Sequence, residues 1–206
     1  MKNRFLILMA AAVLVIALGC KKTETTENTT TTSTTDTTYT DTSATTTTTG
    51  TAPTATGTAA TTLSKDDQEF ATKAAQGNMA EVSLGQMAAQ KGTAPDVKAF
   101  GNRMVNDHGK ALDELKQWAT NKGFTLPTDV SADQKATADK LSKKSGKDFD
   151  KTYADTMADD HEKDAKEFEK ASKDAKDPDL KAWAAKTLPV IQDHLKMAKE
   201  MKGKVK

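Results

Sequence analysis

Residues 95–122, PDVKAFGNRMVNDHGKALDELKQWATNK, decide the fold of this chain. Their apolar positions recur at alternating spacings of four and three, the period of a helix that packs against other helices. The positions on this face are Val97, Gly101, Met104, His108, Ala111, Leu115 and Trp118. The pattern predicts a long helix that begins near Pro95 and ends near Lys122, with a histidine at a core position that leucine would normally hold.

Three further segments show a similar spacing, although it is less regular in the segment over residues 147–176. We predict helices from Ser64, whose side chain can cap a helix, to about Lys91, and over residues 147–176 and 179–202. Their core faces are, in chain order, Phe70, Ala74, Gly77, Glu81, Leu84 and Ala88; Phe149, Tyr153, Met157, His161, Ala165 and Phe168; and Leu180, Ala184, Thr187, Ile191, His194, Ala198 and Met201. The predicted fold class is therefore all-α, with four long helices.

The connection between the second and third long helices is longer than the others. Within it, Ser131-Ala132-Asp133-Gln134 is a capping-box pattern, which predicts a short additional helix. Residues 95–100 (PDVKAF) and 178–183 (PDLKAW) are similar, which indicates two joined helical hairpins. Because so long a connection can cross the length of a bundle, we predict a ferritin-like four-helix bundle with a crossover connection between helices 2 and 3. A simple up-down bundle with a flexible central loop is the alternative.

Each predicted long helix has a polar residue near its midpoint on the core face. These residues are Glu81, His108, His161 and His194, and they include all three histidines of the chain. Antiparallel packing brings helix midpoints to one level, so the four side chains are expected in one layer. Three imidazoles and a carboxylate are suitable ligands for one divalent transition metal: zinc, iron, manganese or copper. The alternative is a metal-free hydrogen-bond network that keeps the helices in register.

An aspartate directly precedes each histidine. These residues are Asp107, Asp160 and Asp193. Neighbouring residues on a helix point about 100° apart, so an aspartate cannot share a ligand with the histidine that follows it. It can instead face the adjacent helix and orient the histidine there. Tyr153, two turns before His161, is expected in the core near this layer.

The first 63 residues indicate export and anchoring. Residues 1–19 combine Lys2 and Arg4 with an apolar run that is too short to span a bilayer, which is typical of a cleavable signal peptide. Residues 16–20, IALGC, resemble the lipobox of bacterial lipoproteins, in which the cysteine, here Cys20, carries the lipid. From residue 23 to 62, 24 of 40 residues are threonine, which predicts that the segment 20–63 is a disordered linker. We expect a lipid-anchored protein of the bacterial cell envelope, on the periplasmic face of the outer membrane, with residues 64–206 as its folded domain.

Charge and composition exclude several classes of function. The chain has 30 Lys and Arg against 29 Asp and Glu, so it has no net field to attract nucleic acid. Cys20 is the only cysteine, so neither an intramolecular disulfide nor a thiolate metal cluster can form. The sequence contains no visible nucleophile–base pair, phosphate-binding loop or glycosidase-like carboxylate pair. The expected partner is the membrane, through the lipid, and a binding role is favoured over an enzymatic one.

Several segments together resemble the family catalogued as domain of unknown function 4142. They are AAQGNMAEV (74–82), VKAFGNRMVNDH (97–108), FDKTY (149–153), DHE (160–162), and Leu188-Pro189 with His194. The resemblance covers residues 64–202. It implies a ferritin-like bundle in exported bacterial proteins, with no established activity, and places Glu81, His108, His161 and His194 at the family's characteristic polar positions.

The same positions differ from those of di-iron ferritin-like proteins. Those proteins have a glutamate three residues before each of two metal-binding histidines. In this chain Val105 and Ile191 stand three residues before His108 and His194, so a di-iron centre would lack most of its carboxylates. Three hypotheses follow: a module that holds one metal ion for storage, buffering or stress protection, a metal-free structural or partner-binding protein, and, least favoured, an oxidase or peroxidase.

Overall fold

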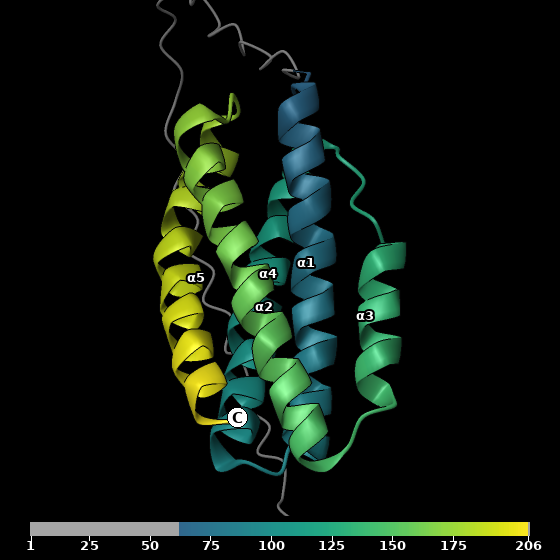
Figure 1. Cartoon of the computed structure of the whole chain (residues 1–206). Coiled ribbons are helices and arrows are strands. Elements are labelled where there is room, and N and C mark those ends of the chain that lie inside the picture. The colour runs from purple at the N-terminus through teal and green to yellow at the C-terminus, as the bar shows by residue number, and fades with distance from the viewer. Residues whose placement is uncertain (1–61, 206) are drawn as a thin grey trace, which may run out of the picture. The chain divides into compact units, whose positions relative to one another are not determined.

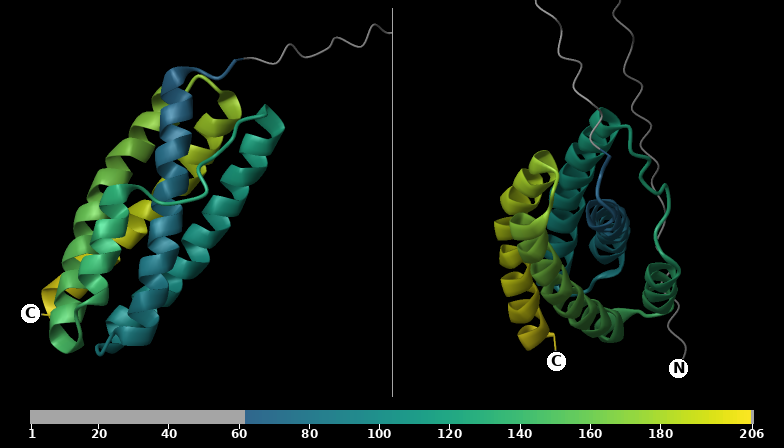
Figure 2. Two further views of the ribbon diagram at one scale, coloured as in Figure 1. Left: turned by 90° about the vertical axis from the view of Figure 1, so that its right-hand side faces the viewer. Right: turned by 90° about the horizontal axis from the view of Figure 1, so that it is seen from above.

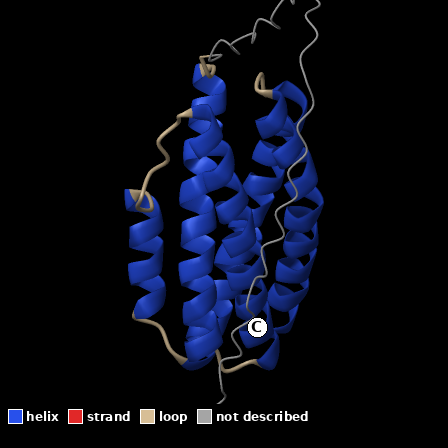
Figure 3. Ribbon diagram, turned by 180° about the vertical axis from the view of Figure 1, so that it is seen from behind, coloured by secondary structure: helices blue, strands red, loops and turns tan. Residues whose placement is uncertain are grey.

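The computed structural model describes residues 62–205, which form five helices and contain no strand (Figures 1 and 3). The helices are α1 (Lys65–Lys91), α2 (Pro95–Lys122), α3 (Ala132–Ser142), α4 (Gly146–Asp174) and α5 (Pro178–Lys204). The all-helical class and the short helix between the second and third long helices are confirmed. The predictions for the signal peptide, for Cys20 and for the threonine-rich segment lie outside the described residues, except that Leu63 packs against the core of the bundle.

The four long helices form two hairpins, α1 with α2 and α4 with α5, which pack against each other (Figure 1). The segment from α2 to α4 passes over α1 and includes α3, which lies against α1 and α4 (Figure 2). Leu141 at the end of α3 is fully buried in the core. This long connection lets α2 and α4 run in the same direction.

Two apolar clusters fill the bundle, one towards each end. The first includes Ala71 on α1, Leu115 on α2 and Trp183 on α5. The second includes Phe100 on α2 and Tyr153 on α4. Along every long helix the mid-helix polar residue lies between the members of the first cluster and those of the second. The predicted polar layer therefore divides the core in two.

Glycine makes the closest approach between α1 and α2 possible. A Cβ on Gly101 would lie 2.6 Å from the backbone oxygen of Gly85, and a Cβ on Gly85 would lie 2.7 Å from the backbone oxygen of Gly101. Both distances are shorter than real Cβ contacts allow, so neither position accepts a side chain without movement of backbone. Gly109, also in α2, has nothing within 4 Å of its Cβ position.

A buried aspartate of each hairpin holds the turn of the other hairpin. Asp150 on α4 accepts hydrogen bonds from the backbone N–H groups of Thr93 and Ala94, with shortest distances of 2.9 and 2.8 Å. Asp67 on α1 accepts hydrogen bonds from the N–H groups of Lys176 and Asp177, both at 3.0 Å. Asp67 and Asp150 are 83 positions apart, the same spacing as Pro95 and Pro178, so the internal repeat extends to these contacts.

Side-chain caps mark the starts of α1, α3 and α5. The Ser64 side chain accepts a hydrogen bond from the Asp67 N–H, and Ser131 and Gln134 form the predicted capping box. Gly92 ends α1 with a negative φ of −53°, so its role is not a left-handed turn. A Cβ there would lie 2.6 Å from the Ala88 carbonyl oxygen, so glycine is needed for close packing. In the part of the chain that the structure describes, no helix is both long and apolar enough to cross a membrane.

We predict that Asp150→Ala lowers the free energy of unfolding by roughly 2–3 kcal/mol, because it leaves the turn N–H groups of Thr93 and Ala94 without their charged acceptor. Urea denaturation measures the change. Asp159→Ala, an exposed position on the same helix, is the control and should change stability by less than about 1 kcal/mol. Equal effects of the two substitutions would contradict the structural role of Asp150.

We predict that Gly101→Ala destabilises the bundle whereas Gly109→Ala does not. The added methyl group at residue 101 meets the backbone of α1, and overpacking of this kind costs about 1–3 kcal/mol. At residue 109 the same change meets open space, and alanine is favoured over glycine in a helix by roughly 1 kcal/mol. The midpoint of thermal denaturation should fall for Gly101→Ala and rise for Gly109→Ala relative to the wild type.

Candidate metal centre

The three histidines meet in the middle of the bundle. His108 comes from α2, His161 from α4 and His194 from α5. Their ring centroids form a nearly equilateral triangle, with separations of 5.5 Å (108–161), 5.2 Å (108–194) and 5.4 Å (161–194). One ring nitrogen from each lies within 4.8 Å of the other two. The helical period predicted that these residues share one level, and the structure brings their rings together.

A hydrogen bond fixes each imidazole at one nitrogen. His108 Nδ1 lies 3.0 Å from Asn78 Oδ1, and His194 Nε2 lies 2.8 Å from Asp107 Oδ2. His161 Nδ1 lies 2.9 Å from the backbone carbonyl oxygen of Met157, which is four residues earlier in the same helix. All three partners are acceptors, so these ring nitrogens carry the hydrogen and donate it. The opposite nitrogen of each ring therefore has a free lone pair.

The three free lone pairs have no partner among the described residues. They belong to His108 Nε2, His161 Nε2 and His194 Nδ1, all of which are buried. A buried polar atom without a hydrogen bond costs about 1–3 kcal/mol, so three together require an explanation. Metal-binding histidines characteristically donate their other N–H to a carboxylate, a carbonyl or a similar acceptor. The arrangement has the donor set and the supporting contacts of a three-histidine metal site.

Burial keeps all three rings neutral. It lowers the pKa of His161 to about 4, and burial together with the adjacent His161 and His194 rings holds the pKa of His108 well below its usual value. Burial also lowers the pKa of His194, although the hydrogen bond to Asp107 acts in the opposite direction. Neutral imidazole is the form that binds a metal ion. At neutral pH the site therefore needs no deprotonation before an ion binds.

Glu81 lies beside the histidine triangle, not within it. Its Oε1 atom is 3.8 Å from His161 Nδ1, the nitrogen already bonded to the Met157 carbonyl. The set of ligand atoms within 4.8 Å of one another does not include this carboxylate. Burial, followed by the nearby carboxylates of Asp164 and Asp160, raises the pKa of Glu81 well above its usual value.

Of the three aspartates predicted to orient a histidine, Asp107 contacts one. Asp107 on α2 reaches across to His194 on α5 and also accepts a hydrogen bond from Arg103 Nε at 3.1 Å. Burial alone would raise the pKa of Asp107, but the hydrogen bonds from His194 and Arg103 lower it.

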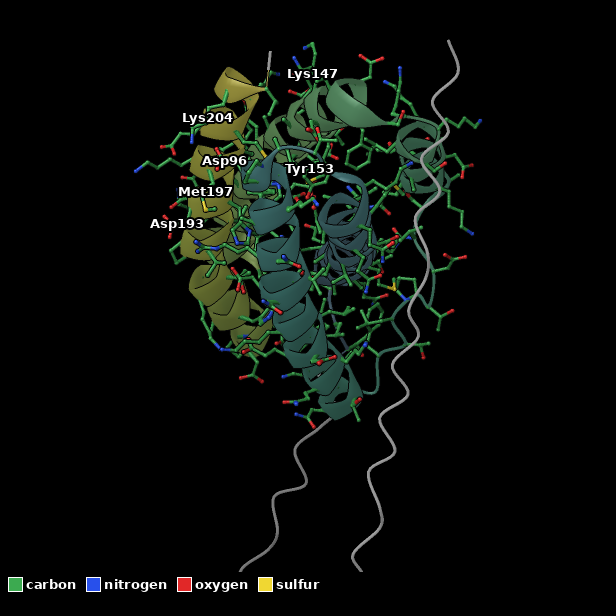
Figure 4. All side chains as sticks on the ribbon, turned by 90° about the horizontal axis from the view of Figure 1, so that it is seen from below. Asp96, Lys147, Tyr153, Asp193, Met197 and Lys204 are labelled. Atoms are coloured by element: carbon green, nitrogen blue, oxygen red, sulfur yellow. The ribbon has the colours of Figure 1, made fainter. Side chains whose placement is uncertain are left out.

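The structure does not bring the other two aspartates to a histidine. Asp160 pairs with Lys163, and Asp193 is exposed on the outer side of α5 (Figure 4). Both point away from the histidine that follows them because consecutive helical residues point about 100° apart. Tyr153 lies inside the bundle (Figure 4), where it stacks on Phe149 at 6.0 Å between ring centroids in the second apolar cluster.

Sequence reasoning assigned no role to Asn78, which orients His108. The Asn78 Nδ2 group donates to the Ala74 carbonyl oxygen at 2.7 Å, and this contact turns Oδ1 towards His108. Asn78 lies one helical turn before Glu81, so its place on the core side of α1 was detectable from spacing. The hydrogen bond between His161 and the Met157 carbonyl, by contrast, could not be predicted from the sequence, because every residue has a backbone carbonyl group.

Comparisons with known proteins identify the family and the fold. The family model described as domain of unknown function (DUF4142) matches residues 52–201, well over half of the chain. The chain belongs to the DUF4142 family. A comparison with curated proteins gives no match.

Three solved structures share the fold of this DUF4142 chain at low sequence identity. A DUF305 fragment from Deinococcus radiodurans is 11% identical, with a TM-score of 0.61, and the match covers 69% of this chain and 98% of the fragment. CopM in its Cu(II)-bound form is 17% identical, with a TM-score of 0.58 and coverage of 67% and 96%. CopM in its Cu(I)-bound form is also 17% identical, with a TM-score of 0.54 and coverage of 65% and 93%. At these identities the matches establish the fold alone.

We predict that acid destabilises the metal-free DUF4142 domain through His161. Its pKa in the folded chain is about 4, below its ordinary value of 6.5, so the unfolded chain binds a proton first and stability falls as pH falls through this window. Between pH 7 and pH 5 this one group contributes a loss of about 2 kcal/mol. Urea denaturation in the presence of chelator should therefore show a weaker pH dependence for His161→Leu than for the wild type. Parallel profiles would contradict the prediction, since Glu81, His108 and His194 are present in both proteins.

Proposed function

We propose that the helical domain binds one transition-metal ion through His108, His161 and His194. The observation that carries this proposal is that three buried histidines, with a ring nitrogen of each within 4.8 Å of the other two, have one nitrogen held by an acceptor and the opposite nitrogen without a partner. Asn78, Asp107 and the Met157 carbonyl fix the ring orientations in advance, so little reorganisation would accompany binding. Storage, buffering or protection against metal stress are the roles that such a site suits.

The donor set favours some metals over others. Three neutral imidazoles suit zinc, copper and iron better than magnesium or calcium, which prefer oxygen ligands. A three-histidine site leaves a coordination position open for water or an exchangeable ligand. The fold shared with copper-bound CopM supports copper as the first ion to examine, with zinc, iron and manganese as the other candidates. Glu81, next to His161, would supply a compensating carboxylate near the bound cation.

We further propose that the domain acts at the bacterial cell envelope. The support comes from the sequence: a signal peptide over residues 1–19, a lipobox-like IALGC ending at Cys20, and a threonine-rich linker before the bundle. A lipid on Cys20 would hold the protein at the periplasmic face of the outer membrane. The two hairpins and the long connection between them also fit a ferritin-like arrangement with a crossover.

A metal-free structural role is the second candidate. It is supported by the hydrogen bonds that already join α1 to α2 through Asn78 and His108, and α2 to α5 through Asp107 and His194. Such contacts keep helices in register without any ion. This role leaves the three inward nitrogens unexplained, which is why metal binding is preferred.

We predict that the full chain, purified without a polyhistidine tag or chelator, binds about one Cu²⁺ or Zn²⁺ ion, and that His161→Ala abolishes this stoichiometric binding. Asn78→Ala should weaken binding by roughly 10–100-fold, because it removes the acceptor that orients His108. Isothermal titration and elemental analysis measure both effects. Paramagnetic resonance of the Cu²⁺ form should show nitrogen ligands.

The control is Thr187→Val, a buried polar position on the same face of α5 whose hydroxyl bonds to the Trp183 carbonyl oxygen. It should leave metal binding unchanged. Substoichiometric metal in the wild type that His161→Ala does not alter would refute the metal site and favour the structural role. Circular dichroism of each variant separates loss of ligand from loss of fold.

A further inference from the structure

The histidine triangle has very little contact with solvent. His161 and His194 are 0% exposed and His108 is 5% exposed. An ion that binds these residues must pass between helices. Of the three histidines, His108 has the largest exposed fraction.

A small cavity leads to His108 between α1 and α4. It has a volume of about 20 Å³, enough for roughly one water molecule, and its lining includes Gly77, Asn78, His108 and Asp164. Nothing lies within 4 Å of the Cβ position of Gly77, so the absence of a side chain there leaves the space open. Buried His108, whose Nε2 has no hydrogen-bond partner, is thus a wall of a cavity that also has the exposed side chains of Lys73 and Glu167 in its lining.

The cavity carries acidic groups suited to a cation. Asp164 and Glu167, one turn apart on α4, both line it. Burial, then the carboxylates of Asp160 and Glu167, raises the pKa of Asp164 to about 7, although the ammonium group of Lys163 acts in the opposite direction. Lys73 also lines the cavity, but its ammonium group is paired with Glu69 at 2.7 Å.

On the α2–α5 side of the histidine layer, the salt bridge between Arg103 and Asp107 lies next to His194. There Asp107 bonds to His194, and Arg103 bonds to Asp107 and to Met197 Sδ at 3.3 Å. A cation approaching from that side would meet the arginine and would have to break these bonds. The charge distribution therefore favours one direction of approach.

We propose that the Gly77 cavity is the passage by which the metal ion reaches the histidines, with Asp164 as the carboxylate that first binds it. This inference rests on the proposed metal-binding function. In this passage Gly77 provides the space, Asp164 and Glu167 attract the hydrated cation, and His108 is the first of the three ligands to be met. Asp164 is the repeat equivalent of Glu81, 83 positions later, but it lies at the cavity and not in the buried layer.

The test is the rate of metal binding after the passage is filled. In the full chain, Gly77→Leu places a side chain in open space, so it should preserve the fold while slowing both association and dissociation of Cu²⁺ by roughly tenfold or more, with Kd within about twofold of the wild type. Stopped-flow quenching of Trp118 and Trp183 fluorescence gives the association rate, and a chelator chase gives the dissociation rate. Gly109→Leu is the matched control, since residue 109 is also a mid-helix glycine with free space and does not line the cavity.

Asp164 is tested separately by Asp164→Asn. At pH 8, above the pKa of about 7 of Asp164, association of Cu²⁺ should slow by roughly three- to tenfold and lose part of its ionic-strength dependence, because the steering charge is removed. Glu162→Gln, an exposed carboxylate on α4 paired with Lys166, is the control and should leave the rate unchanged.

Wild-type rates in Gly77→Leu, or equal slowing in Gly77→Leu and Gly109→Leu, would overturn the passage while leaving the metal site intact. Absence of stoichiometric Cu²⁺ binding in the wild type would instead refute the proposed function itself. The two failures are therefore distinguishable.

Discussion

Three imidazoles buried between two apolar clusters are the constraint around which this bundle is organised. A buried imidazole must satisfy at least one nitrogen, and here an amide, a carboxylate and a backbone carbonyl serve as the acceptors. Two of these bonds cross between helices, so the orientation of the rings and the register of α1, α2 and α5 are coupled. Phe100 packs edge-on against His161 and His194, at 6.0 and 6.3 Å between centroids, and limits the space on one side of the layer.

The internal repeat explains both the regularity and the asymmetry of the molecule. Near the turns the two halves of the repeat make equivalent contacts. Asp67 accepts hydrogen bonds from the turn between α4 and α5, and Asp150 accepts them from the turn between α1 and α2. At the centre the repeat is broken: the position equivalent to Asn78 is His161, and the position equivalent to His108 is Ile191. A symmetric centre would repeat the same side chains on both hairpins. The divergence instead supplies three histidines and one amide, Asn78, that orients His108.

Glu81 and Asp164 occupy equivalent positions in the repeat, but their surroundings differ. Glu81 is buried beside His161, whereas its repeat equivalent Asp164 lines a cavity that reaches His108. Both carboxyl groups have raised pKa values, because burial and neighbouring acids disfavour their charged forms. One face of the layer is therefore acidic and open at Gly77, and the other is closed by Arg103 and Asp107. This difference between the two faces supports entry from the Gly77 side in the proposed metal-binding role.

The sequence by itself determined the helices, their caps and the level at which the histidines lie. Helical period and capping chemistry are local, so Ser64, the Ser131–Gln134 box and the core faces could be read from spacing. Only the tertiary structure decided which atoms meet. The packing of α1 against α2 places Asn78 against His108, and the packing of α2 against α5 brings Asp107 to His194, while Asp193 faces solvent. These contacts depend on the packing of residues far apart in the chain, such as the Gly85–Gly101 approach, and period alone does not specify helix rotation or rotamer.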